Sequence, residues 1–95
     1  MGETRQVRCI CKNDRFDPSD RITHIGGVHL NGKRWKLTQQ EAIRGIETGK
    51  SRFYVNVAGE RDWLVVAFSI SGNLYLKTGN DKDEPNSLLI LPECP

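Results

Sequence analysis

The sequence has no long hydrophobic run. No stretch approaches the roughly 18 apolar residues of a membrane-spanning helix, and the first residues lack the apolar core of a secretory signal. Cysteine is scarce, and the odd set of Cys9, Cys11 and Cys94 shows no disulfide framework. No Asn-x-Ser/Thr glycosylation acceptor occurs. These absences predict a cytoplasmic protein with reduced thiols and no membrane contact.

Neither sign of charge dominates the composition. The chain has 14 basic and 12 acidic side chains, a net charge of +2, which excludes a strongly basic nucleic-acid arm. The charge is uneven, because residues 1–61 hold 12 basic and 7 acidic side chains whereas residues 62–95 hold 2 and 5. The first part therefore has the charge to steer an anionic partner. A length of 95 residues predicts a single domain, residues 1–95.

Extended structure is predicted for the first part of the chain. Residues 5–12 alternate as one strand, which places Val7 and Ile10 on opposite faces. Residues 13–20 form a predicted loop, because one proline and three aspartates favour turns. Residues 21–25 resume a strand.

Glycines punctuate the next segment. The Gly26-Gly27 pair predicts a bend or bulge. The Asn31-Gly32 dipeptide is the strongest signal of a two-residue hairpin turn. The predicted register places Leu30 opposite Lys33, Val28 opposite Trp35 and His29 opposite Arg34.

A helix start is marked at Thr38. Thr38 and Glu41 have the spacing of a capping box, in which each side chain bonds the other residue's amide. Ala42 begins a short apolar stripe, and Gly49 is placed to end the helix. The sequence therefore predicts one helix over Gln39–Thr48.

The second half has the alternation of a three-stranded meander. A first turn at Gly59-Glu60 would place Ala58 opposite Arg61 and Val55 opposite Leu64. A three-residue loop, Ser71-Gly72-Asn73, would pair Ile70 with Leu74 and keep the apolar faces together. The acidic residues 80–86 form a loop, and Ser87–Leu91 either pairs as a final strand or packs over the core.

These elements predict an α+β fold. It has a mostly antiparallel β-sheet, made of a hairpin, a three-stranded meander and edge strands, and one covering α-helix.

Several phrases of the chain resemble one family. They are Ile25-Gly26-Gly27, Arg34-Trp35-Lys36-Leu37, Glu41-Ala42-Ile43 with Gly49, Phe53-Tyr54-Val55, Tyr75-Leu76-Lys77-Thr78, Pro85-Asn86-Ser87-Leu88-Leu89 and Leu91-Pro92-Glu93-Cys94. Together they resemble the small, mainly bacterial proteins grouped as domain of unknown function 3892. The resemblance covers nearly the whole chain, and the closing Leu-Pro-Glu-Cys is its most specific piece. It implies one domain of prokaryotic or phage origin and supplies no catalytic residue.

Three chemical motifs are incomplete. Gly27–Lys33 fits the start of a P-loop, but Arg34 stands where Ser or Thr should hold Mg²⁺, and the lysine opens a strand instead of a helix. Cysteine–histidine catalysis would need a nucleophile held more rigidly than Cys94 beside its prolines. We therefore expect no enzyme, no catalytic residue and no cofactor. A zinc site built from the three cysteines with His24 and His29 has the right ligand types but the wrong spacing.

One face of the meander is unusually aromatic. Opposite the predicted core it carries Tyr54, Asn56, Trp63, Val65, Ala67 and Tyr75. These side chains are either internal, covered by another segment, or part of a recognition surface. Aromatics flanked by cations are typical of single-stranded nucleic-acid recognition. The candidate binding residues are Arg34, Lys36, Lys50, Arg52, Tyr54, Arg61 and Trp63.

Three functional hypotheses follow. The first is a non-enzymatic binding or accessory module that acts through a protein partner. The second is a nucleic-acid-binding module that uses the basic and aromatic sheet face. The third is a thiolate metal site.

Overall fold

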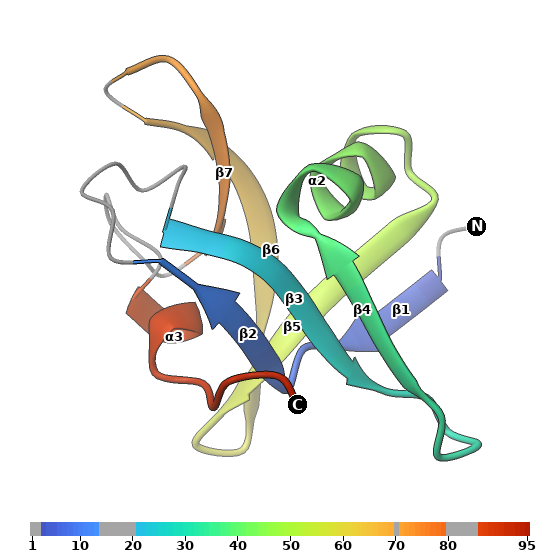
Figure 1. Ribbon diagram of the computed structural model, residues 1–95. Coiled ribbons are helices and arrows are strands. Elements are labelled where there is room, and N and C mark those ends of the chain that lie inside the picture. Colours follow the sequence, from blue (N-terminus) through green and yellow to red (C-terminus); the bar gives the residue numbers. More distant parts are fainter. Residues whose placement is uncertain (1–2, 14–20, 70, 80–85) are drawn as a thin grey trace.

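Two β-sheets and one main helix make up the protein (Figure 1), which confirms the predicted α+β class. The computed structural model describes residues 3–13, 21–69, 71–79 and 86–95, so the two predicted loops at 13–20 and 80–86 lie almost entirely outside the described residues. None of the helices in these residues is long and apolar enough to cross a membrane. The elements are β1 Glu3–Gln6, β2 Cys9–Lys12, β3 Ile22–Val28, β4 Arg34–Thr38, α2 Gln39–Glu47, β5 Ser51–Val57, β6 Glu60–Phe68, β7 Leu74–Thr78 and α3 Asn86–Leu89.

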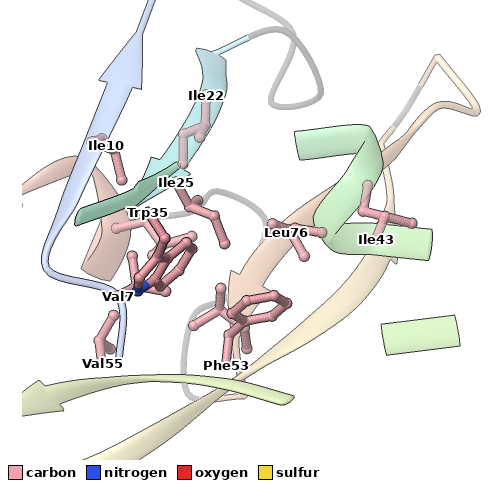
Figure 2. Close-up of a cluster of buried hydrophobic side chains, with 12 residues drawn as sticks. Val7, Ile10, Ile22, Ile25, Trp35, Ile43, Phe53, Val55 and Leu76 are labelled. Atoms are coloured by element: carbon pink, nitrogen blue, oxygen red, sulfur yellow. The ribbon is translucent and has the colours of Figure 1, made fainter. Parts of the chain in front are cut away.

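The strands form one sheet in the order β1-β5-β6-β7 and another in the order β2-β3-β4. In Figure 1 the smaller sheet lies in front of the larger one, and β3 crosses β5 and β6. β1 runs parallel to β5, and the other strand pairs of the sheets are antiparallel. Side chains from both sheets and both helices meet in one core (Figure 2). Its buried members are Val7, Ile10, Ile22, Ile25, Trp35, Ala42, Ile43, Phe53, Val55, Leu64, Leu76 and Leu88.

The predicted strand over residues 5–12 is wrong, because the chain changes sheets within it. The Val7 amide donates to the Tyr54 carbonyl in the larger sheet at 2.8 Å, and the next amide, of Arg8, donates to Gly26 in the smaller sheet at 2.8 Å. The change of direction breaks the two-residue alternation. Val7 and Ile10, which were predicted on opposite faces, are therefore both buried in the core.

The first hairpin has a three-residue turn instead of the predicted two-residue turn. The His29 amide bonds the Lys33 carbonyl at 2.8 Å, and Val28 lies opposite Arg34. Gly32 alone takes a left-handed φ, +86°, which matches a three-residue hairpin loop closed by a left-handed glycine. The resulting slip of one residue turns Val28 and Leu30 out to solvent, and it places Trp35 opposite Gly27.

In both hairpins of the meander, the strand pairing is shifted by two residues from the predicted register. Ala58 and Gly59 form the first turn, with φ values of 52° and 86°, and Val55 lies opposite Asp62 instead of Leu64. In the second hairpin Phe68 pairs with Leu74, in place of Ile70, which lies outside the described residues. A two-residue slip keeps every side chain on its face. The predicted alternation of faces was therefore right even though the partners were wrong, but Phe68, predicted on the buried face, is 74% exposed.

The helix begins where its capping box predicts. The Glu41 amide donates to Thr38 Oγ1 at 3.1 Å, and the Thr38 amide donates to Glu41 Oε1 at 2.9 Å. α2 ends one residue before the predicted Thr48. Ala42 and Ile43 face the core. Gln39 is also buried, and its Oε1 is satisfied there because it accepts a hydrogen bond from the Leu76 amide of β7 at 3.1 Å.

The carboxyl-terminal segment packs over the core, which was one of the two predicted outcomes. Residues of the predicted last strand form the short helix α3, whose Leu88 is fully buried. The chain then returns to β2, where Glu93 makes a parallel bridge with Ile10. This return brings Cys94 to Cys9.

Candidate functional site

Four predicted residues form a ladder on the outer face of β5 and β6. Tyr54 and Trp63 lie directly opposite each other, with ring centroids 5.5 Å apart and an interplanar angle of 60°. The Arg52 guanidinium lies over the Trp63 ring at 4.0 Å, and the Arg61 guanidinium lies over the Tyr54 ring at 4.5 Å. Each arginine is two residues before an aromatic of its own strand, so it meets the other strand's ring diagonally. We call Arg52, Trp63, Tyr54 and Arg61 the ladder.

The ladder holds its cations without neutralising them. Attraction to the ring face orients a guanidinium but leaves its positive charge and its edge N–H donors available. In the described part of the chain neither Arg52 nor Arg61 forms an ion pair. Both residues are exposed, whereas Tyr54 and Trp63 are half-buried. The arrangement therefore presents two oriented cations beside two aromatic rings.

An open groove of about 1250 Å³ runs between the ladder and the hairpin of β3 and β4. β1 supplies part of its lining, because it pairs with β5 beside the ladder. Compact small-molecule pockets hold about 300–1,000 Å³, so the volume suits an extended ligand. We call it the ladder groove; its lining is Glu3, Thr4, Arg5, Gln6, Arg8, Val28, His29, Leu30, Asn31, Lys33, Trp35, Arg52, Tyr54, Arg61 and Trp63.

The ladder groove is strongly positive. Five arginine or lysine side chains line it, against the single carboxylate of Glu3. The Arg5 guanidinium donates to Glu3 Oε2 at 2.8 Å and also lies 5.2 Å from the centroid of the Trp35 ring. This hydrogen bond, assisted by the charge of Arg5, lowers the pKa of Glu3 from 4.5. The only acid in the lining is therefore already paired, and the remaining cations face the opening.

The structure divides the predicted site residues. The four ladder residues come together, but Arg34 and Lys36 line a different hollow, and Lys50 lines neither. They are separated because β4 belongs to the smaller sheet, where Arg34 and Lys36 lie, as predicted, on the face opposite the buried Trp35. Tyr75 is only 3% exposed, so the aromatic face is open at Tyr54 and Trp63 and closed at β7.

The second hollow has a volume of about 370 Å³ and lies beside a disulfide. Cys9 and Cys94 are joined, so the prediction of three reduced cysteines is wrong, and only Cys11 is free. Nothing in the local sequence signals this pairing, because 85 residues separate the partners. We call this space the disulfide hollow; its lining is Arg8, Cys9, Gly27, Val28, Arg34, Trp35, Lys36 and residues 92–95.

The Gly26-Gly27 pair makes no bulge, contrary to the prediction. Both glycines pair regularly with β4 inside β3. A Cβ atom on Gly26 would lie 2.8 Å from the Trp35 carbonyl oxygen and 2.9 Å from Cys94 Sγ. A Cβ atom on Gly27 would lie 2.5 Å from the Gln6 carbonyl oxygen. Close approach of backbone and sulfur atoms, not a bend, therefore requires glycine at both positions.

The other chemical motifs lie apart from the ladder chemistry. Lys33 lies in the hairpin turn and Arg34 opens β4, so no helix follows the P-loop-like stretch, as the sequence indicated. His24 Nδ1 lies 2.9 Å from the Thr23 hydroxyl. The ring centroids of His29 and Trp35, which both line the ladder groove, are 6.5 Å apart. In residues 3–13, 21–69, 71–79 and 86–95 no three His, Cys, Asp or Glu side chains gather as a metal site.

Sequence reasoning missed the cations that β1 and the hairpin contribute. Arg5, Arg8 and Lys33 join the ladder groove because β1 pairs in parallel with β5 and because the hairpin leans over the same face. The excess of basic residues in the first part of the chain was the only available signal. It carried no information on which strand lies beside which.

Comparisons with known proteins identify the family and nothing closer. No curated protein and no solved structure matches the chain. The family described as "Protein of unknown function (DUF3892)" matches residues 6–92. This match includes the residues of the ladder and, among the described residues, every helix and strand except most of β1. The chain therefore belongs to the DUF3892 family.

Proposed function

We propose that the protein is a non-enzymatic binding module whose ladder groove takes single-stranded nucleic acid. One observation carries the proposal: two arginines stacked on two exposed-face aromatics border a groove with five arginine or lysine side chains and one paired carboxylate. Single strands are bound by cations that follow the phosphates and by planar groups on which bases stack. The ladder supplies both kinds of group within two neighbouring strands.

The geometry favours a single strand over a duplex. Bases in a duplex are stacked on each other, whereas an unpaired base is free to stack on an aromatic ring or on a guanidinium plane. In the ladder the guanidinium carbons of Arg52 and Arg61 already lie over the rings, 4.0 and 4.5 Å from the ring centroids. An incoming base extends this stack, and the edge N–H groups of the same arginines meet the phosphates.

A protein segment is the second candidate occupant, and a specific observation supports it. Leu30 at the hairpin tip is completely exposed, and Val28 beside it is 44% exposed. Both line the ladder groove. Exposed apolar side chains at a basic groove suit an acidic peptide with an apolar anchor. This second candidate corresponds to the hypothesis, made from the sequence, that the protein acts through a protein partner.

An NMR titration separates the two candidates. Labelled protein is titrated with a pool of random single-stranded oligonucleotides about eight nucleotides long, at about 50 and about 200 mM salt. We expect shifts at Arg52, Tyr54, Arg61 and Trp63 that weaken at the higher salt, and little change with a duplex of the same length. An acidic peptide titrated in the same way is expected to move Val28 and Leu30 first if the second candidate is right.

The matched variants are Arg52→Gln and Lys50→Gln. Each removes one positive charge, but only Arg52 belongs to the ladder, and Lys50 lines neither hollow. We expect Arg52→Gln to weaken binding and Lys50→Gln to leave it nearly unchanged. Absence of any binding at about 50 mM salt, where phosphate contacts are strong, would falsify the nucleic-acid proposal.

A further inference from the structure

Residues 92–95, which follow the core-packed Leu91, are tied to β2 by two backbone hydrogen bonds and one disulfide. The Ile10 amide donates to the Pro92 carbonyl at 3.0 Å, and the Cys94 amide donates to the Ile10 carbonyl at 2.9 Å. The disulfide between Cys9 and Cys94 is the covalent link. By contrast, Leu88 anchors α3 in the core and is fully buried. Breaking the disulfide therefore leaves only these two hydrogen bonds as the described backbone ties of residues 92–95 to β2, and it removes no anchor of the core.

The fold provides a seat for both sulfur atoms. A Cβ atom on Gly26 would lie 2.9 Å from Cys94 Sγ and 3.0 Å from Cys9 Sγ, so the two sulfurs rest against bare β3 backbone. Gly26 of β3 pairs with Lys36 of β4, and the neighbouring Gly27 pairs with Trp35. The two sulfur atoms are thus packed beside β3 and β4, and residues of these two strands line both hollows.

The disulfide is also placed where a thiol can reach it. Cys9 and Cys94 are only half-buried, and both line the open disulfide hollow. Three cations line the same hollow, namely Arg8, Arg34 and Lys36. Positive surroundings favour the approach of an attacking thiolate and stabilise the cysteine thiolate that leaves.

We propose that Cys9–Cys94 is a reducible latch that regulates the ladder groove, an inference whose effect on binding rests on the proposed function. A thiolate of a dithiol reductant attacks one sulfur, the S–S bond breaks and a mixed disulfide forms. The second thiol of the reductant then displaces the protein sulfur and closes a cyclic disulfide. Two electrons and two protons pass from the dithiol to the protein, which leaves Cys9 and Cys94 as free thiols.

Release of the tail changes the charge beside the ladder groove. Arg8, Val28 and Trp35 line both hollows, so the two spaces share a wall. Residues 92–95 form the other side of the disulfide hollow and bring the Glu93 carboxylate among its cations. When the tail leaves, this negative charge leaves with it, while the exposed cations Arg34 and Lys36 stay. The reduced protein therefore binds an anionic strand more tightly.

The first experiment tests the latch without nucleic acid. The folded protein is treated with dithiothreitol, its thiols are alkylated, and the added mass is counted while amide exchange is followed by NMR. We expect two additional alkylated cysteines, selectively faster exchange at Cys94 and Ile10, and a core that stays folded, with protection at Phe53 lowered only by the overall loss of stability. The latch is wrong if the thiols appear only in denaturant that unfolds the protein, or if the Cys94 amide stays protected after reduction.

The second experiment measures oligonucleotide affinity in both redox states at about 50 mM salt. Cys11→Ser serves as the latched control, and Cys9→Ser with Cys94→Ser serves as the permanently open form. We expect the reduced and open forms to bind about threefold more tightly, the scale of one removed like-sign charge near a phosphate site. Equal affinity in all forms overturns the regulation. If the tail is released but no form binds, the latch stands and the proposed function fails.

Discussion

The two hollows share a wall yet differ in almost every property that decides binding. The ladder groove is long, open and lined by cations oriented on aromatic rings. The disulfide hollow is about a third as large and is closed on one side by residues 92–95. Both contain Arg8 and Trp35. The difference teaches that the same excess of basic residues can be arranged over aromatic rings in an open groove or beside a cross-linked segment in a smaller hollow, depending on the sheet to which each strand belongs.

The largest effect is expected on the closed side. Reduction of the disulfide releases a loop of 85 residues, nearly the whole chain, from its cross-link. Chain-entropy estimates for a loop of that length predict a loss of about 4–5 kcal/mol in the free energy of unfolding. Urea unfolding of oxidised and reduced Cys11→Ser protein measures it. Identical midpoints would show that the disulfide does not restrain the unfolded chain.

Gly26 tests how tightly the disulfide hollow is packed. Gly26→Ala places a Cβ atom 2.8 Å from a backbone oxygen and about as close to two sulfurs, so we expect a destabilisation of about 1–3 kcal/mol. Gly79→Ala is the matched control, because nothing lies within 4 Å of its added Cβ atom. Chemical denaturation compares the two variants. An equal cost for both would mean that β3 yields easily at Gly26.

The open side is tested by removing a ladder cation. Replacement of Arg61 by Gln removes the guanidinium that lies over Tyr54, and with it one charged contact to phosphate. We expect about a tenfold loss of oligonucleotide affinity and a salt dependence shallower by about one counterion. Fluorescence anisotropy at several salt concentrations checks both quantities. A loss of affinity with an unchanged salt slope would assign Arg61 to stacking instead of phosphate contact.

The smallest effect is expected at a site that lines neither hollow. The Thr38 amide bonds the Glu41 carboxylate, and this lowers the pKa of Glu41 from 4.5. A lowered folded-state pKa means that the stabilisation is present above about pH 4.5 and is lost as pH falls through the folded value. Thr38→Ala removes the Oγ1 acceptor of the Glu41 amide and costs about 1 kcal/mol, but it keeps the Thr38 amide. Glu41→Gln removes the titrating carboxylate and should flatten the pH dependence of thermal unfolding below pH 4.5. Oligonucleotide affinity should not change.

Local signals predicted the elements that depend on neighbouring residues. The helix cap at Thr38 consists of hydrogen bonds between residues three apart in the sequence, so the local sequence predicted it, and the structure confirms it. The faces of the meander were also right, because a slip of two residues preserves the alternation of side chains. The first hairpin failed for the complementary reason. Its slip of one residue, at Gly32, moved Val28 and Leu30 away from the face of the buried Trp35 and out to solvent.

The candidate site was predictable only where both its strands are consecutive. Tyr54 and Trp63 belong to one hairpin, so their place on a common face followed from the alternation of side chains, whereas their direct pairing did not, because the predicted register was two residues off. Arg34 and Lys36 were assigned to the same surface, but the structure places them in the disulfide hollow. No local pattern shows on which side of a second sheet a strand will lie.

The sequence by itself determined the helix, its cap, the number of hairpins and which aromatic residues share a face. These depend on backbone geometry and hydrogen bonds that span a few residues. Only the tertiary structure decided the change of sheets between Val7 and Arg8, the parallel pairing of β1 with β5 and the link between Cys9 and Cys94. Each of these joins residues far apart in the chain, and the burial of the whole core selects the partner.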